Sequence, residues 1–517
     1  MDINTNLVEN FIAIMPEVLM AVLALAVVYL DLYLPPTQRR TIGYVAGIGM
    51  LAIAALALFI PTPSDFNEQL MWGGTIRNDD LAKIFRVTVI LIGGLTCFMG
   101  MGDNRLRYKS EFYTILIIAT IGASLLSAAS DIIMLFVALE TMSISLYILS
   151  GFVRLPQFPT PEEKRFANLS AESGVKYFLF GSFTSAFLLY GLSLLYGFSG
   201  GYTNLYEIGP GLVGGEHPTA PIIVALGLVA VGFGFKVSAV PFHFWTPDVY
   251  EGSPTPVTSF ISVASKAASF AVLTRFMLAV FPPEQLLPEG IQSISYSEWW
   301  VQLFAIAAVL TMTIGNLLAL VQTNFKRLIA YSSIAQAGYT LIGLVAIATG
   351  NNAGDGAAAV AFYMVIYAFT NTLLFGCLIL FTNQTGSEMI ADMAGLSRRN
   401  PWLALGLTVA LLSLAGIPPA AGFFGKFLLF RAAVDANLTW LAVVGVLNSI
   451  VALYYYLVVI KVMYVDRSAE DNLPIPIAVP YNFVLAATAV FVILLGVLPA
   501  LVVNLATEAG ADLFFLP

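Results

Sequence analysis

The sequence predicts an all-α polytopic membrane protein with about fourteen transmembrane helices. Three observations predict this class. Hydrophobic residues make up 59% of the 517 positions and charged residues only 10%, whereas a soluble domain carries about 25% charged residues. The apolar residues form segments of about 20, the length at which a helix crosses the hydrocarbon core. The connections between the segments are short, so no soluble domain is inserted. Lipid cannot pair open backbone groups, and each segment is therefore expected to be helical.

The expected spans follow one another along the whole chain. Two polar breaks, DNRLRYKSE and SAASD, divide the longest apolar stretch into three spans. The expected limits are 11–34, 41–60, 80–101, 112–129, 131–153, 171–198, 221–245, 256–281, 299–321, 328–349, 357–382, 402–431, 437–464 and 480–506.

Positive charge in the loops supports this count and predicts the orientation. When the loops are assigned alternately to two sides, Arg77 and Arg431 fall on one side and all other loop lysines and arginines on the other. A wrong number of spans would mix the two groups. Basic loops stay on the cytoplasmic side or its equivalent, so both termini are expected on the opposite face. The basic side receives Arg39, Arg40, Arg105, Arg107, Lys109, Arg154, Lys164, Arg165, Lys326, Arg327, Arg398, Arg399 and Arg467.

Two of the spans contain prolines deep inside them. The seventh, GLVAVGFGFKVSAVPFHFW, contains Pro241, and the twelfth, LTVALLSLAGIPPAAGFFGKFLLF, contains Pro418 and Pro419. Proline has no N–H, so the carbonyl four residues earlier loses its helical partner. In the twelfth span these carbonyls belong to Leu414 and Ala415. Simple kinked helices are the alternative, but broken helices at corresponding places in two halves indicate a transport site.

The two broken spans are five spans apart, and an odd repeat length inverts the second copy. We therefore expect two inverted five-helix repeats, spans 4–8 and 9–13, with broken helices 7 and 12. The expected domains are residues 1–110 with three helices, 111–281 with the first repeat, 299–465 with the second repeat, and 466–517 with the last helix and the tail.

Five of the charged residues inside apolar spans are the main candidates for function. They are Glu140, Lys176, Lys236, Lys266 and Lys426. A charge at mid-membrane depth costs about 2.5–3.5 kcal/mol on insertion scales, and such residues often form proton relays. Glu140 and Lys236 are expected to pair, either within a relay or as a structural ion pair. Lys176 is either a relay group or a side chain that reaches to the surface. Lys266 lies among small residues that leave room for water, and Lys426 is expected on the basic-face side of its break.

Other polar residues in the spans carry weaker indications. His243 follows the first break, and imidazole titrates near neutral pH, so it is either a relay group or a structural histidine. Arg275 and Lys461 lie near span ends and are interpreted as anchors. Cys97 and Cys377 are too few and too isolated for a zinc or iron–sulfur site, and are expected to be small buried hydrophobes. No phosphate loop or dinucleotide motif occurs.

Four long runs resemble the antiporter-like membrane subunits of complex I, the NADH:quinone oxidoreductase. They are VPFHFWTPDVYEGSPTPVTSFISVASKAASFAVL (240–273), KRLIAYSSIAQAGY (326–339), RNPWLALGLTVALLSLAGIPPAAGFFGKF (399–427) and FVALETMSISLYIL (136–149). The TPDVYEG run is similar to the N type, also called subunit 2, of complex I or of its photosynthetic relative. The resemblance implies fourteen helices and proton translocation along a polar axis at mid-membrane depth.

The resemblance also implies which residues act. The positions that match the functional positions of the family are Glu140, Lys236, Lys266 and Lys426, and Lys176 matches a lysine often found in the N type. Where the family usually has a histidine after AYSSI, this chain has Gln336. A glutamine carries no proton, which puts a relay step at that position in doubt.

The resemblance places the redox chemistry elsewhere. Flavin, iron–sulfur clusters and quinone are expected in partner subunits, with no cofactor in this chain and no nucleic acid as partner. The expected location is an energy-coupling membrane, a bacterial inner membrane or a thylakoid, with basic loops in the cytoplasm. Two alternatives remain: a subunit of a multisubunit Na⁺/H⁺ antiporter, which shares the fold, and a passive scaffold whose charges are structural.

Overall fold

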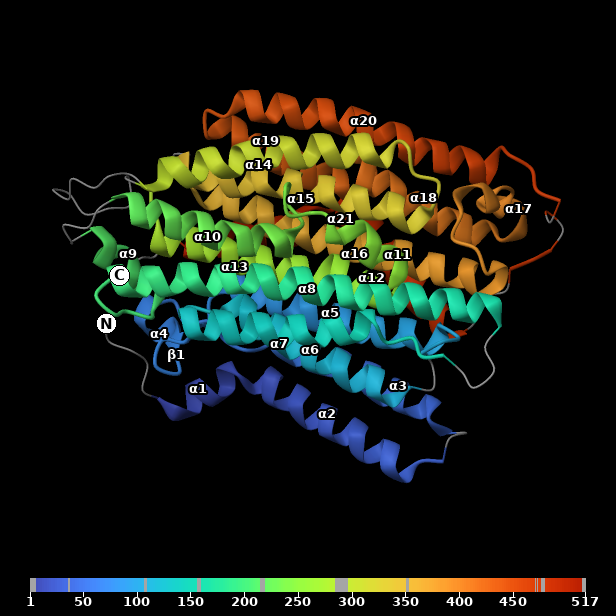
Figure 1. Cartoon of the computed structure of the whole chain (residues 1–517), viewed down its shortest axis with the longest axis horizontal. Coiled ribbons are helices and arrows are strands. Elements are labelled where there is room, and N and C mark those ends of the chain that lie inside the picture. Colours follow the sequence, from blue (N-terminus) through green and yellow to red (C-terminus); the bar gives the residue numbers. More distant parts are fainter. Residues whose placement is uncertain are drawn as a thin grey trace.

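The computed structural model of the chain is a bundle of long helices that run along one common direction (Figure 1). It describes residues 6–35, 38–106, 109–155, 160–213, 219–283, 296–349, 353–469, 471, 473–475 and 479–513.

The helices and the one small sheet follow in this order: α1 Leu7–Ala13, α2 Met15–Tyr33, α3 Arg40–Leu58, α4 Phe66–Gln69, β1 Leu70–Met71, β2 Ile76–Arg77, α5 Asp80–Gly102, α6 Ser110–Ala128, α7 Ile132–Ser150, α8 Pro161–Phe198, α9 Leu205–Val213, α10 Thr219–Val237, α11 Trp245–Gly252, α12 Thr255–Phe260, the π-helix η2 Ile261–Ser265, α13 Lys266–Val280, α14 Tyr296–Ala319, α15 Phe325–Thr349, α16 Ala353–Thr385, the 3₁₀ helix η4 Ile390–Met393, α17 Leu396–Arg399, α18 Pro401–Ala415, α19 Gly422–Asp435, α20 Thr439–Tyr464, α21 Val479–Val497 and α22 Ala500–Asp512.

The all-α membrane class is confirmed. Within the described residues, 12 helical segments are long and apolar enough to cross a membrane, and a further pair, α21 and α22, is bent by 76° at a short break. The expected span 402–431 is divided into α18 and α19, and α18 is shorter than a usual span. The total of fourteen spans and the inverted repeat stay predictions.

Both proline-containing spans are interrupted where the sequence indicated. The first stops at Val237 and resumes at Trp245, whose indole N–H donates to the carbonyl of Phe235 at 3.0 Å. The second stops at Ala415 and resumes after Gly416, which takes a left-handed φ of 83° that favours glycine. Carbonyls inside the bundle are thereby left free of helical partners and available to side chains.

The two ends of the bundle are covered by different short helices. α17, which carries two arginines, lies at one end, whereas α1, α4 and α9 lie at the other (Figure 1). α19 follows the second break and leads away from the α17 end, so the expectation that Lys426 lies on the basic-face side of the break is wrong. The cause is chain direction: the span enters at α17 and runs toward the opposite end.

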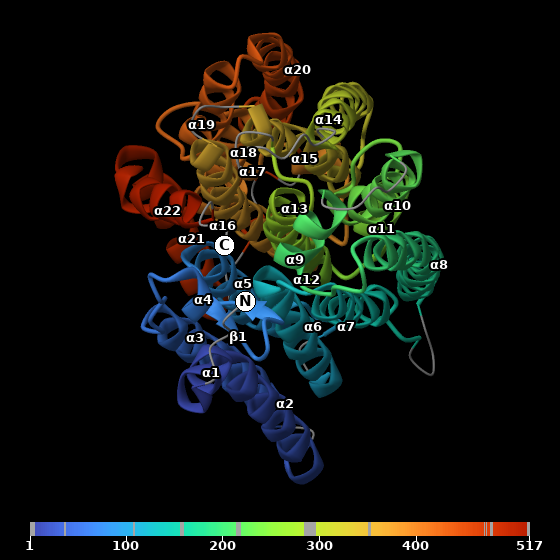
Figure 2. The ribbon, with the colours of Figure 1, turned by 90° about the vertical axis from the view of Figure 1, so that its left-hand side faces the viewer.

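The core is formed by the segment 255–280 and by α16, whose span windows are completely buried. Figure 2 shows α13 and α16 in the middle of the bundle, with α2, α8 and α20 at its periphery. A short antiparallel hairpin, β1–β2, pairs Leu70 with Arg77 and Met71 with Ile76. No strand was expected here from the sequence, because two-residue strands leave no periodic pattern.

Candidate functional site: a line of buried lysines

Lys236 is the last but one residue of α10 and is buried beside the first break. Its ammonium donates to the hydroxyl of Ser143 at 2.6 Å and to that of Tyr147 at 3.3 Å, both on α7. The Tyr147 ring lies 5.4 Å from the same nitrogen. Hydroxyl oxygens and a ring face stabilise the ammonium without supplying a full negative charge.

Glu140 lies on the same helix, α7, and on the same side, since Ser143 follows it by three positions. Its carboxylate accepts a hydrogen bond from Ser185 of α8 at 2.6 Å. The expected direct pair with Lys236 is not formed among the described residues. Glu140 interacts electrostatically with Lys236 without touching it, because the Ser143 hydroxyl occupies the ammonium.

Lys266 begins α13, directly after the π-helix η2, and is 1% exposed. Its ammonium donates to the carbonyl of Ser333 at 2.9 Å and to the Ser333 hydroxyl at 2.7 Å. The same hydroxyl accepts from Tyr367 at 2.7 Å and lies 3.0 Å from the Tyr250 hydroxyl. Neither Ser333 nor the π-helix was expected from the sequence; a π-helical turn is a distortion that is frequent at functional sites.

Gln336 follows Ser333 on the same side of α15 and continues the polar line. Its amide oxygen accepts from the hydroxyl of Tyr363, and its amide nitrogen donates to the Leu414 carbonyl at 3.1 Å and to Tyr456 at 3.2 Å. Tyr363 and the tyrosine that bonds Ser333 are one turn apart on α16 and stack. Gln336, which stands where the family usually has a histidine, therefore links Tyr363 of α16 to the Leu414 carbonyl at the second break.

Lys426 of α19 is hydrogen-bonded to the second carbonyl that the prolines were predicted to free, that of Ala415. Its buried ammonium donates to the Ala415 carbonyl at 3.3 Å and lies 4.4 Å from the centre of the Tyr339 ring. The Tyr339 hydroxyl in turn accepts from Asn316 of α14 at 3.1 Å. Both carbonyls opened by the proline pair are thus satisfied by side chains of the predicted line.

The remaining predicted residues lie off this line. Lys176 is about one third exposed and forms ion pairs of 2.6 Å with Glu172 and with Asp248 of α11, and Asp248 also pairs with Arg327. His243 lies in the first break with its ring 4.6 Å from that of Phe244. Neither Lys176 nor His243 contacts the buried lysines within the described part of the chain.

Several polar residues were misjudged or missed from sequence. Arg275 is not an anchor, because it is fully buried and pairs with Asp79. Glu17, whose role the sequence left open, forms a buried ion pair of 2.6 Å with Arg86 of α5. Lys461 is exposed and forms an ion pair with Asp466, which follows it closely in the chain, as expected of an anchor.

One of the predicted loop cations is also buried. Lys326 donates to the carbonyls of Glu251 and Ser253 at 2.9 and 2.8 Å, which end α11, and pairs with Glu388 at 3.3 Å. Outside the spans, Asp471 accepts from Arg398 at 2.8 Å, and its own hydrogen bond from the Ser468 backbone together with that guanidinium lowers its pKa. The two cysteines are buried, as expected.

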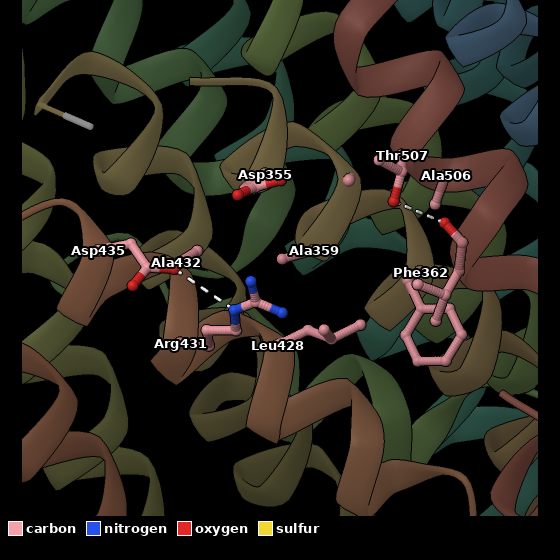
Figure 3. Close-up of a pocket in the computed structure, with 11 residues that line it drawn as sticks. Asp355, Ala359, Phe362, Leu428, Arg431, Ala432, Asp435, Ala506 and Thr507 are labelled. Atoms are coloured by element: carbon pink, nitrogen blue, oxygen red, sulfur yellow. Dashed lines mark hydrogen bonds and ion pairs between the residues drawn. The ribbon is translucent and has the colours of Figure 1, made fainter. Parts of the chain in front are cut away.

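A pocket of about 80 Å³ lies between α16, α19 and α22 at the end opposite α17. Figure 3 shows its charged lining: Asp355 from the start of α16, and Arg431 and Asp435 from the end of α19. Arg431 and Asp435 lie 3.4 Å apart as an ion pair. α19 begins after the second break and carries both Lys426 and Arg431, so the pocket lies beyond the break, toward the end of the bundle opposite α17.

Sequence comparison identifies relatives over nearly the whole chain. The family model described as NADH:quinone oxidoreductase/Mrp antiporter, TM, matches residues 129–452. NAD(P)H-quinone oxidoreductase subunit 2 of Nostoc sp. is 43% identical over 460 residues, which cover 88% of this chain and 82% of the relative. NADH-quinone oxidoreductase subunit N of Moorella thermoacetica is 39% identical over 503 residues, 97% and 98% of the two chains.

Solved structures show the same architecture. A chain of respiratory complex I from Thermus thermophilus with bound aureothin superimposes with a TM-score of 0.75 at 31% identity, covering 95% of this chain and 99% of its own. A chain of the Mrp complex from Dietzia sp. superimposes with a TM-score of 0.78 at 20% identity, covering 98% of each chain. The second likeness indicates a shared fold only.

Proposed function

This chain belongs to the NADH:quinone oxidoreductase/Mrp antiporter family of membrane subunits, and from this membership we propose that it is the N-type (subunit 2) proton-translocating subunit of an NAD(P)H:quinone oxidoreductase, complex I. It is an integral membrane protein that works with the other membrane and peripheral subunits of that enzyme. Flavin, iron–sulfur clusters and quinone lie in those partners, and this chain moves H⁺.

One observation carries the proposal. Among the described residues, three of the buried lysines donate to hydroxyl or carbonyl oxygens rather than to a carboxylate, whereas the buried Lys326 pairs with Glu388. A buried lysine without a counter-ion is expensive to keep charged, since burial disfavours the charged form. Such a group can bind and release a proton when the charge beside it changes. The three lysines are Lys236, Lys266 and Lys426.

Each member of the line has a distinct proposed role. Glu140 senses the neighbouring subunit and shifts the charge of Lys236 through space. Lys266 holds a proton in the centre, against Ser333. Gln336 carries no proton, but its two-sided hydrogen bonding orients the groups between the centre and Lys426. Lys176 and His243 serve at most as side branches, because they contact none of the three lysines among the described residues.

The stretch between Lys236 and Lys266 is aromatic. Tyr147 packs edge-on against Tyr177 at 4.8 Å, and Tyr177 stacks on Trp245 at 4.4 Å. The buried hydroxyl of Ser238, beside the first break, lacks a protein partner among the described residues. Buried hydroxyls of this kind are usually satisfied by ordered water, which supports a hydrated connection along this stretch.

The orientation and the outlet follow from the same picture. We place the basic α17 end in the cytoplasm, or its equivalent, and both termini on the opposite side. Protons leave from Lys426 through the charged pocket that contains Asp355 and Asp435. The membrane is a bacterial inner membrane or a thylakoid membrane.

Replacement of Lys266 by methionine tests the proposal. The variant Lys266→Met keeps the length of the side chain but cannot hold a proton, so proton uptake coupled to quinone reduction should be lost in proteoliposomes of the purified complex. The control Lys461→Met removes an exposed lysine and should pump normally. Full pumping by an assembled Lys266→Met complex would leave only the scaffold interpretation.

The antiporter alternative predicts different partners. Purification of the tagged chain from its native membrane should recover flavin and iron–sulfur subunits if it belongs to complex I. Recovery of antiporter subunits alone would favour the second reading. The relatives at 39–43% identity are oxidoreductase subunits, whereas the antiporter likeness is 20%.

A further inference from the structure

Lys426 is held by fewer oxygen atoms than the other two lysines of the line. Its ammonium donates to the Ala415 carbonyl at 3.3 Å. Lys236 and Lys266, in contrast, reach serine hydroxyls at 2.6 and 2.7 Å, and each has a second oxygen partner. A single hydrogen bond of this length stabilises a buried ammonium only weakly. A further partner is therefore needed if Lys426 is to hold a proton.

The ring of Tyr339 on α15 is that partner. Its centre lies 4.4 Å from the Lys426 ammonium, compared with 5.4 Å for each of two rings beside Lys236. The negative face of an aromatic ring attracts a cation, and the attraction is strongest where both groups are removed from water. Both Tyr339 and Lys426 are buried. The ring therefore stabilises the charged form of Lys426 without supplying a counter-ion.

An amide on the neighbouring helix holds this ring in place. Asn316 of α14 donates to the Tyr339 hydroxyl at 3.1 Å. Asn316 also donates to the backbone carbonyl of Asn448 at 3.1 Å and accepts from the Tyr455 hydroxyl at 3.0 Å, and both of these residues lie on α20. All of these side chains are buried, where a polar group that loses its partner costs free energy. The orientation of the ring towards Lys426 is therefore determined by α14 and α20.

Two glycines bring α14 and α15 close enough for this contact. Gly315 and Gly338 directly precede the amide and the tyrosine. A Cβ at Gly315 would lie 2.7 Å from the backbone nitrogen of Ala335, and one at Gly338 would lie 2.7 Å from that of Met312. Only residues without a side chain fit at such a distance. Figure 2 shows α14 and α15 next to each other, with α20 on the outer side of the bundle.

The other titratable groups on this side of the bundle are mainly tyrosines. Tyr363 of α16 lies against Gly425, the residue before Lys426, and Tyr456 of α20 bonds Gln336. α18 has no titratable side chain, and α21 has none among the side chains that the structure describes. The charged residues of α16 and α19 line the pocket further along α19: Asp355, Arg431 and Asp435. The Tyr339 ring is thus the group that acts on the ammonium by direct contact.

We propose that Tyr339 is the residue that enables Lys426 to hold a proton, and that Asn316 is a positioning residue that keeps its ring in place. The ring stabilises the ammonium in the interior and so determines the pH range in which Lys426 can be loaded. This inference rests on the proposed proton translocation and assigns two further residues to its last step.

Replacement of the ring tests the inference in proteoliposomes of the assembled complex. Tyr339→Leu removes the ring, whereas Tyr339→Phe keeps it. Protons taken up per donor oxidised are measured over a series of pH values. Without the ring the ammonium is less stable, so the pH at which Tyr339→Leu loses half of its pumping should be lower by about one unit. Tyr339→Phe should keep the profile of the parent complex.

Asn316→Leu removes the amide that holds the hydroxyl, and should move the profile in the same direction but by less. The matched control is Tyr113→Leu, which removes a fully buried tyrosine of α6 and should leave the profile unchanged. The proposal is overturned by an unchanged profile in Tyr339→Leu, or by an equal shift in Tyr339→Phe or in the control. An unchanged profile in Asn316→Leu overturns the positioning role alone.

Should Tyr339→Leu fail to assemble, Tyr339→Met takes its place. Failure of both variants to assemble would assign the ring to folding and overturn the proposal. Lys426→Met separates this inference from the proposed function. Loss of pumping in Lys426→Met together with an unchanged profile in Tyr339→Leu overturns the inference about the ring alone. Pumping that persists in Lys426→Met overturns the translocation role of this lysine itself.

Discussion

Single residues show how a lysine can be buried in this bundle without an acid beside it. Lys236 meets two hydroxyls of α7, Lys266 meets the hydroxyl and carbonyl of Ser333, and Lys426 meets a carbonyl opened by the second break. Hydrogen bonds to an ammonium are stronger than neutral ones, but none of these oxygens carries a full charge. The protonation of each lysine is therefore left sensitive to charges further away.

The first prediction at this scale concerns Ser333. Its hydroxyl bonds Lys266 and Tyr367 and lies beside Tyr250, so Ser333→Ala removes the centre of the cluster but keeps its carbonyl. A hydrogen bond to a charged group contributes about 1.5–3 kcal/mol, and coupled pumping should fall at least about tenfold. The control Ser127→Ala removes a buried hydroxyl that bonds only its own helix and should pump normally. Unchanged pumping in Ser333→Ala would remove this residue from the path.

At the scale of elements, hydrogen bonds of the backbone hold the break between α18 and α19 in shape. The hydroxyl of Ser413 accepts from the Gly422 backbone at 3.2 Å, so the end of one half-helix caps the start of the next. The Ala421 backbone donates to the carbonyl of Val492 on α21 at 3.1 Å. These contacts hold the two half-helices so that Leu414 and Ala415 present their carbonyls to Gln336 and Lys426.

Gly422 supplies the prediction at this scale. A Cβ at this position would overlap the Ser413 carbonyl, which is backbone and cannot move alone. Gly422→Ala should therefore lower the thermal stability of the complex, since overpacking typically costs about 1–3 kcal/mol. The control is Gly227→Ala on α10, where a Cβ meets nothing within 4 Å, and no loss is expected. Equal melting temperatures of the two variants would show that the break tolerates a side chain.

At the scale of the whole molecule, the two ends of the bundle carry different groups. The α17 end carries Arg398 and Arg399, which lie on the cytoplasmic side in the proposed orientation. The opposite end carries the β1–β2 hairpin, the buried Arg275–Asp79 ion pair and the charged pocket between α16, α19 and α22.

Sidedness can be measured with single cysteines. Ser64→Cys lies in the exposed loop before α4, and Lys164→Cys lies on the exposed first turn of α8 at the α17 end. A membrane-impermeant maleimide added to intact cells should label the first and reach the second only after permeabilisation. The native Cys97 and Cys377 are buried and give little background. The reverse labelling pattern would invert the proposed orientation.

Much of the fold could be predicted from sequence, because each prediction depended on local chemistry. The apolar segments, the prolines of the two breaks and the carbonyls freed at Leu414 and Ala415 are all properties of a few neighbouring residues. The expected direct ion pair of Glu140 with Lys236 is not formed among the described residues, where the ammonium bonds two hydroxyls of α7 and Glu140 acts on it only through space. The interpretation of Arg275 as an anchor was wrong, because its partner, Asp79, is distant in sequence and could not be recognised from a local pattern.

By itself the sequence determined the membrane class, the places where helices break and which charges lie at membrane depth, since hydropathy and proline geometry act within a few residues. Only the tertiary structure decided which oxygen each lysine bonds, how Gln336 joins two elements, and how Arg275 comes to pair with Asp79. Those contacts join residues far apart in the chain, and no local pattern encodes them, because they depend on how the helices pack against one another.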